Sequence, residues 1–75
     1  MKDLHIKVKA YAGHKAGEKP FGFTLQDKEY RIEEIMETAV EERAGHRRVT
    51  FRVRTEDGVF KIYCSQKDGE WYLEK

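Results

Sequence analysis

The sequence predicts an all-β fold, a small five-stranded antiparallel sheet that curls or closes into an SH3-like barrel. Two observations support this prediction. Apolar and polar side chains alternate in several separate segments, which is the period of a half-buried strand. The pairs Asp57-Gly58 and Asp68-Gly69 each follow such a segment, and Asp-Gly is a strong signal for a two-residue hairpin turn. A chain of 75 residues is long enough for one domain, so we expect residues 1–75 to form a single domain.

The first half of the chain contains two segments with strand-like alternation. The first covers residues 4–11 and ends at a polar, glycine-containing loop over residues 13–20. The second starts at Phe21, and a tight turn at Asp27-Lys28 would return the chain antiparallel to it. The pairs expected across this turn are Leu25 with Tyr30 and Phe23 with Ile32.

Residues 33–44 allow two interpretations. From Ile32 onward, apolar residues follow the helical spacing i, i+3, i+4, i+7, i+8, which gives an α+β alternative with a helix at about residues 33–44. The other interpretation is a bent strand with a bulge near Glu33-Glu34 that runs to a turn at Ala44-Gly45. Local propensity favours the helix and the surrounding β context favours the strand, so both stay open.

Residues 48–74 are predicted to form a three-stranded meander around the two Asp-Gly turns. With these pairs in the turns, Val53 lies opposite Ile62 and Cys64 lies opposite Leu73, and the apolar partners share one face. A slip of one residue would exchange the two faces. The predicted buried face consists of Val49, Phe51, Val53, Phe60, Ile62, Cys64, Trp71 and Leu73.

The composition limits the function classes and the compartment. The chain has 15 basic and 14 acidic residues, and a net charge of +1 gives no bulk attraction to DNA or to an acidic membrane. A single cysteine excludes an intrachain disulfide. The charged N-terminus lacks the apolar core of a signal peptide, and no stretch is apolar enough to span a membrane. We therefore expect a cytoplasmic protein and leave its oligomeric state open.

Core and turn positions over residues 20–74 form a series of short motifs. They are Pro20-Phe21, Phe23, Tyr30-x-Ile32-x-x-Ile35, Phe51-x-Val53, Asp57-Gly58, Phe60-x-Ile62-Tyr63 and Gly69-Glu70-Trp71-x-Leu73. In these positions the chain resembles a family of small uncharacterised bacterial β-rich proteins that end in an aromatic meander. It departs from them at Ala39 and Val40, where the family carries a tryptophan. The resemblance implies an SH3-type barrel and no activity, because none is established for the family.

No combination of residues has the spacing of a catalytic or metal site. The possible metal ligands, His5, His14, His46 and Cys64, show neither C-x-x-C nor H-x-x-x-H spacing. A thiol in an apolar core is inert, so a nucleophilic Cys64 is not expected. The segment 13–19 resembles a phosphate loop only superficially, because the Gly-Lys-Ser/Thr end is missing. We therefore predict no enzyme activity, no cofactor and no metal.

One group of residues suggests a binding function. The meander puts basic and aromatic side chains on the face opposite the core, with Arg52 directly facing Tyr63. The proposed ligand-binding residues are Arg52, Arg54, Lys61, Tyr63 and Tyr72. Such a face suits single-stranded nucleic acid, through base stacking and phosphate attraction. In the structural interpretation, arginine stems merely pack on tyrosine rings and the acidic segment 33–44 covers the face. The alternative function is a protein-interaction or self-associating domain that pairs through a sheet edge or through the tyrosine face.

Overall fold

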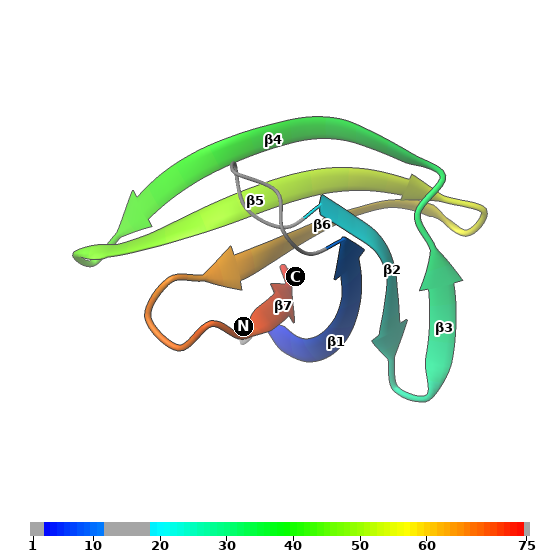
Figure 1. Cartoon of the computed structure of the whole chain (residues 1–75), viewed down its shortest axis with the longest axis horizontal. Helices are drawn as coiled ribbons and strands as arrows, with labels where there is room; N and C mark the ends of the chain where they lie inside the picture. Colours follow the sequence, from blue (N-terminus) through cyan, green and yellow to red (C-terminus); the bar gives the residue numbers. More distant parts are fainter. Residues whose placement is uncertain (1–2, 12–18, 75) are drawn as a thin grey trace.

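The chain folds into one curled sheet (Figure 1). A computed structural model describes residues 3–11 and 19–74. The strands are β1 (Leu4–Tyr11), β2 (Lys19–Leu25), β3 (Lys28–Arg31), β4 (Glu34–Arg43), β5 (His46–Thr55), β6 (Gly58–Ser65) and β7 (Trp71–Leu73). They form a seven-stranded sheet in the order β3-β2-β1-β7-β6-β5-β4, with every neighbouring pair antiparallel. The all-β prediction is confirmed. The count of five strands is wrong, because β3 and β4 are both separate strands.

The sheet curls into a half-barrel because its two edge strands follow each other in the chain. β3 and β4 stand at opposite edges, yet only Ile32 and Glu33 connect them. The Ile32 N–H donates to the carbonyl of Phe21 in β2 at 3.0 Å, whereas the Glu33 N–H donates to the carbonyl of Arg54 in β5 at 2.8 Å. Two adjacent residues thus hold opposite sides of the sheet together. The more specific SH3-like assignment stays a prediction.

The inner side of the half-barrel carries the hydrophobic core. Its most buried residues are Ile6, Phe23, Phe51, Val53, Ile62, Trp71 and Leu73. The Phe23 ring stacks on Tyr30 at a centroid distance of 4.9 Å and meets Phe60 edge to face at 5.7 Å, which joins the two halves of the chain. Val49, Phe60 and Cys64 pack against this core while partly exposed. The predicted buried face is therefore confirmed in its composition, although Cys64 is not fully buried.

Three predicted hairpins exist, but each has a register shifted by two residues. The observed pairs are Val53–Phe60, Cys64–Trp71 and Phe23–Tyr30, in place of the expected Val53–Ile62, Cys64–Leu73 and Phe23–Ile32. A shift of two residues leaves every side chain on its predicted face, because the side-chain period of a strand is two. The predicted registers are wrong, and the predicted faces are right.

The turn between β5 and β6 shows why alternation alone did not fix the register. Glu56 and Asp57 occupy the turn, and Gly58 begins β6 with a φ of 122°. The Thr55 hydroxyl accepts a hydrogen bond from the Asp57 N–H at 3.1 Å and donates one to the Gly58 carbonyl at 3.2 Å. This threonine-capped turn takes the place of the expected Asp-Gly turn, because the hydroxyl satisfies backbone groups that the turn leaves open.

The connection between β6 and β7 is longer than expected. The Ser65 N–H donates to the Glu70 carbonyl at 2.9 Å, so residues 66–69 form a four-residue loop. Gly69 adopts a φ of 73°, and Asp68 accepts a hydrogen bond from the Glu70 N–H at 2.9 Å. Gly69 is thus required for its left-handed conformation, although it lies at the end of the loop and not in a two-residue turn.

Of the two interpretations of residues 33–44, the helix is wrong and the bent strand that runs to a turn at Ala44-Gly45 is confirmed, because this segment is β4. It pairs with β5 from Glu34 to Arg43 and returns through Ala44 and Gly45, whose φ values of 53° and 79° suit a tight hairpin turn. The register changes between Ile35 and Glu37, which places a bulge at Met36 and not near Glu33-Glu34. A bulge interrupts strict alternation, and the resulting spacing of apolar residues imitates a helical stripe.

Candidate nucleic-acid interface

The five residues predicted as a ligand-binding face all lie on strands of the meander, with side chains directed away from the core. Arg52 lies opposite Lys61, and Tyr63 lies opposite Tyr72. The expected Arg52–Tyr63 pair is wrong, since the shifted register places Thr50 opposite Tyr63. The face exists, but two of its basic residues lie opposite each other and its two tyrosines lie opposite each other, so cations and rings do not alternate across the strands.

A cluster of charges occupies the middle of this face. Arg48, which is 8% exposed, donates to Glu41 at 3.1 Å and lies 3.4 Å from a carboxylate oxygen of Glu74. Lys61 approaches the same two carboxylates at 3.2 and 3.4 Å, and Asp3 lies 4.0 Å from Arg48. We call Asp3, Glu41, Arg48, Lys61 and Glu74 the Arg48 cluster. It joins both ends of the described chain to β4, β5 and β6, and it neutralises Lys61.

The two arginines of the predicted face differ in their surroundings. Arg54 forms an ion pair with Glu34 at 3.0 Å, and both side chains are half exposed. Arg52 is exposed and has no ion pair with another described residue. The acidic strand β4 therefore lies beside the basic strand β5 in the same sheet. Its carboxylates pair with arginines of β5 from the side and do not cover the predicted face.

The two tyrosines of the predicted face are stacked on each other at 5.3 Å. Tyr63 is 8% exposed, its hydroxyl donates to Asp3 at 2.5 Å, and the Arg48 guanidinium lies 4.1 Å from its ring centroid. Tyr72 is half-buried and donates to Asp68 at 2.8 Å. The Tyr63 ring is thus occupied by contacts within the protein, and Tyr72 is the ring that a ligand can reach more easily.

The environment of Tyr63 predicts a pH dependence of stability. Burial, together with the hydrogen bond to Asp3, raises the pKa of Tyr63 from 10.0 to about 12. A raised folded-state pKa means that stability is fully present below pH 10 and is lost as the pH rises towards 12. We expect a tyrosinate absorbance titration to show a late component that Tyr63→Phe removes and that Asp3→Asn shifts to lower pH. A late component unchanged in Tyr63→Phe would contradict this assignment.

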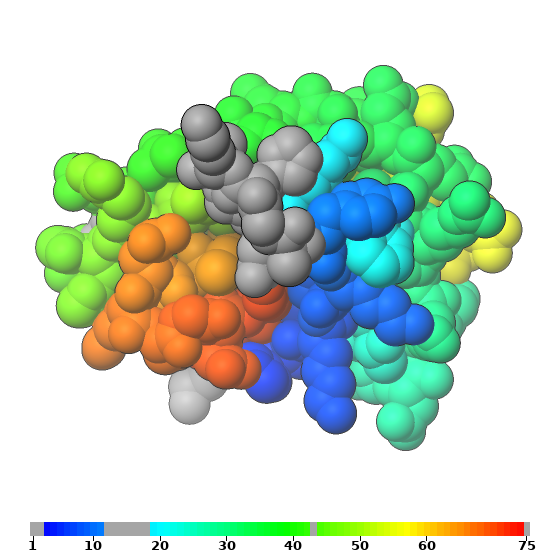
Figure 2. Space-filling view, viewed as in Figure 1, coloured from blue at the N-terminus to red at the C-terminus, as the bar shows by residue number. Residues whose placement is uncertain are grey.

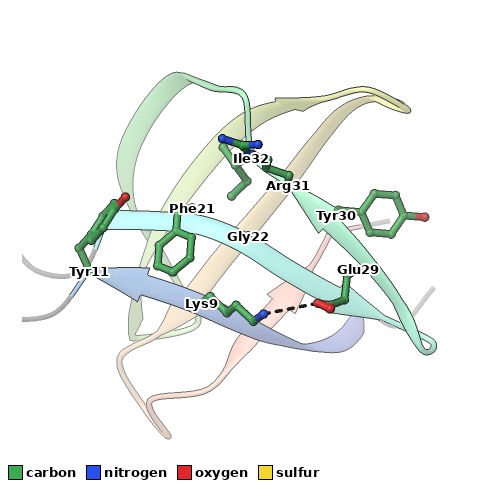
Figure 3. Close-up of a pocket in the computed structure, with 8 residues that line it drawn as sticks. All are labelled: Lys9, Tyr11, Phe21, Gly22, Glu29, Tyr30, Arg31 and Ile32. Atoms are coloured by element: carbon green, nitrogen blue, oxygen red, sulfur yellow. Dashed lines mark hydrogen bonds and ion pairs between the residues drawn. The ribbon is translucent and has the colours of Figure 1, made fainter.

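A second surface on the outer side of β1, β2 and β3 forms a groove of about 440 Å³ (Figure 3). The Tyr11 and Phe21 rings lie 4.7 Å apart and are 57% and 39% exposed. Lys9, Gly22 and Arg31 lie side by side across the three strands, because Lys9 pairs with Gly22 and Gly22 pairs with Arg31. We call these residues, Lys9, Tyr11, Phe21, Gly22 and Arg31, the Gly22 groove.

The backbone explains why this groove exists. The β1–β2 register shifts after Lys9, so that Ala10 pairs with Pro20 and Phe21 is left as the extra residue of a bulge. The bulge turns Phe21 outward, whereas strict alternation would place it on the core side with Phe23. A Cβ atom at Gly22 would lie 3.2 Å from the carbonyl of Tyr30, so glycine is favoured there and leaves the groove floor open.

The charges of the Gly22 groove remain accessible. Lys9 contacts Glu29 at 3.4 Å, and both side chains are well exposed. Arg31 is exposed and has no ion pair with any described residue. Glu29 also lines the groove, so it offers a ligand two flat aromatic surfaces, the cation of Arg31, unpaired among the described residues, and a Lys9 ammonium that is held in an exposed ion pair. Sequence reasoning missed it, although Pro20 and Gly22 around an aromatic residue are signals for a bulge.

Residues 3–11 and 19–74 contain no group of three His, Cys, Asp or Glu side chains that could hold a metal ion. The Glu70 carboxylate accepts a hydrogen bond from the His5 ring at 2.6 Å. His14 and most of segment 13–19 lie outside the described residues. No helix within those ranges could span a membrane.

Comparison of the chain with family models, curated proteins and solved structures gives no match. The resemblance to small bacterial β-rich proteins therefore stays a prediction.

Proposed function

We propose that this protein is a cytoplasmic, non-enzymatic module that binds single-stranded nucleic acid at the Gly22 groove. The observation that carries the proposal is the exposed Tyr11–Phe21 pair, with ring centroids 4.7 Å apart, next to Lys9 and Arg31. Aromatic rings beside cations on an open sheet are the arrangement that single strands use, because every base has a flat face and every phosphate is negative.

The spacing of the strands suits this ligand. Neighbouring strands are about 4.8 Å apart, so the backbones of Lys9 and Arg31 lie about 10 Å apart on either side of Gly22. Both side chains are long and exposed, so they can turn towards a phosphate above Gly22 while the adjoining base stacks on Phe21 or Tyr11. A duplex keeps its bases stacked inside the helix and would leave the aromatic pair unused. The groove therefore favours single strands over duplexes.

The first test is the affinity of a labelled oligothymidylate, measured by fluorescence anisotropy at low salt. Phe21→Ala and Tyr11→Ala are each expected to cost about 1–3 kcal/mol per lost stacked base, or roughly 5- to 150-fold in affinity. Lys9→Ala or Arg31→Ala should weaken binding and reduce the slope of log affinity against log salt by about 0.7 each. A matched control is Val59→Ala, which removes a 52% exposed apolar side chain from another strand.

The face predicted from the sequence stays a competing location for the same function. Tyr72→Ala and Arg52→Ala distinguish the two surfaces, since Tyr72 is its accessible ring and Arg52 its free cation among the described residues. Loss of affinity in these two variants, with no effect of Phe21→Ala, would move the site to the meander. No binding of any oligonucleotide at low salt would overturn the proposed function.

The outer edge of β4 favours a second candidate, a protein-interaction or self-associating domain. Within the described residues β4 pairs only with β5, and its Met36 and Val40 side chains are 47% and 62% exposed. An edge strand presents free backbone groups to another chain. The salt dependence of binding distinguishes the two candidate functions, because an apolar protein contact persists at salt concentrations that abolish phosphate binding. A concentration-dependent mass in sedimentation that Val40→Lys abolishes would support this candidate.

A further inference from the structure

A second basic and aromatic hollow lies on the outer side of the sheet, separate from the Gly22 groove. It measures about 310 Å³, and its lining includes the stacked Tyr63 and Tyr72 rings together with the exposed residues His46, Arg47 and Lys67. We call it the Tyr72 hollow and define it by these five residues. Arg48 and Asp68 also line it, but Arg48 is held by its own cluster and Asp68 accepts the Tyr72 hydroxyl.

The outer face of β1 connects the two hollows. Its exposed residues His5, Lys7, Lys9 and Tyr11 alternate with the inward-facing Ile6 and Val8. At one end, the His5 ring meets Tyr72 edge to face at 5.5 Å, and at the other end Tyr11 meets Phe21 at 4.7 Å. From His5 to Tyr11 the strand covers about 20 Å, at about 3.3 Å per residue.

β1 lies between the strands that carry the two hollows, because it pairs with β7 on one side and with β2 on the other. In Figure 2 the atoms of β1, in blue, lie between the orange and red segment that leads into β7 and the cyan to teal strands β2 and β3. His5 at one end of the line is paired with Glu70 at 2.6 Å, whereas Lys7 has no ion pair with any described residue, so an unpaired cation stands near the middle of the line.

We propose that the Gly22 groove, the outer face of β1 and the Tyr72 hollow form one track for a single nucleic-acid strand. This inference rests on the proposed function and specifies its ligand as an oligonucleotide long enough to reach both hollows. A strand held in the Gly22 groove brings its next nucleotides along β1, so contact with the Tyr72 hollow becomes an intramolecular event. Affinity then rises steeply once the strand spans both sites.

The decisive experiment measures affinity for oligothymidylates from about 2 to about 12 nucleotides in length, with the wild-type protein and three variants. We expect an affinity gain of about tenfold or more at the length that first spans both hollows. Lys67→Ala should abolish much of this gain and leave the shortest ligands unaffected. Lys7→Ala should reduce the salt slope for long ligands by about 0.7, and Phe21→Ala should weaken ligands of every length.

The outcomes separate the track from the proposed function. If affinity does not rise beyond the shortest bound ligand and Lys67→Ala changes nothing, while Phe21→Ala still weakens binding, the track is wrong and the groove remains. If no length binds at low salt, both proposals are overturned. Lys28→Ala is the matched control, because this lysine pairs with Asp57 at 2.6 Å at the end of the β2–β3 hairpin, away from β1.

Discussion

Replacement of Phe23 by alanine is expected to remove about half of the free energy of unfolding. Phe23 is 2% exposed, and its ring packs between Tyr30 and Phe60. Loss of a buried phenylalanine costs about 3–5 kcal/mol through lost burial and the cavity left behind. A domain of 75 residues has a total of only about 4–11 kcal/mol, so urea denaturation should show a greatly lowered midpoint.

Phe21→Ala is the matched control for this experiment. Phe21 is two residues away, carries the same ring and is 39% exposed on the outer face. We expect a smaller loss of stability, about 1–2 kcal/mol, because 39% of Phe21 already contacts solvent and its ring lies outside the core. The two phenylalanines should thus separate stability from oligonucleotide affinity. Equal losses of stability in both variants would show that Phe21 belongs to the core and would remove the basis of the Gly22 groove.

The sequence predicts which side chains lie on each face of the sheet more reliably than it predicts the register of the strands. Alternation assigns a side chain to one of two sides, and a shift of two residues leaves this assignment unchanged. The eight residues of the predicted buried face therefore all contact the core, although each hairpin pairs two residues away from its expected partner. Register depends on turn geometry, and the Thr55 hydroxyl that stabilises the β5–β6 turn has no signal in the alternation.

Bulges account for the other differences. The bulge at Met36 imitates a helical pattern in β4, and the bulge at Phe21 exposes a ring that alternation would bury. Both are set by the pairing with a neighbouring strand, β5 for Met36 and β1 for Phe21, and strict alternation does not include an extra residue. The predicted ligand face shows the same limit. Its Lys61 and Tyr63 are engaged by Glu41 and Asp3, partners that only the folded sheet brings near.

The second large effect is expected for Arg48→Ala, a substitution outside the hydrophobic core. The Arg48 side chain is 10% exposed, packs on the Tyr63 ring and lies within 3.4 Å of carboxylates from Glu41 and Glu74. Removing one partner from a largely buried ion pair leaves the other charges uncompensated, which costs about 3 kcal/mol. Arg54→Ala is the matched control on the same strand. Its pair with Glu34 is 53% exposed on both sides, so we expect about 0.5 kcal/mol or less.

Two further measurements separate charge from packing in the Arg48 cluster. Arg48→Met keeps an unbranched apolar stem on the Tyr63 ring, so it should recover part of the loss if packing contributes. Hydrogen bonds from Lys61 and Arg48 lower the pKa of Glu41 below 4.5, so the wild type should lose stability as the pH falls through this lowered pKa. Without Arg48, Glu41 binds its proton more readily, and the acid-induced loss should be smaller. If Arg48→Ala and Arg54→Ala destabilise the protein equally, with identical pH profiles, the cluster is a solvated surface network, and Lys61 is free to contact a ligand as the sequence alone suggests.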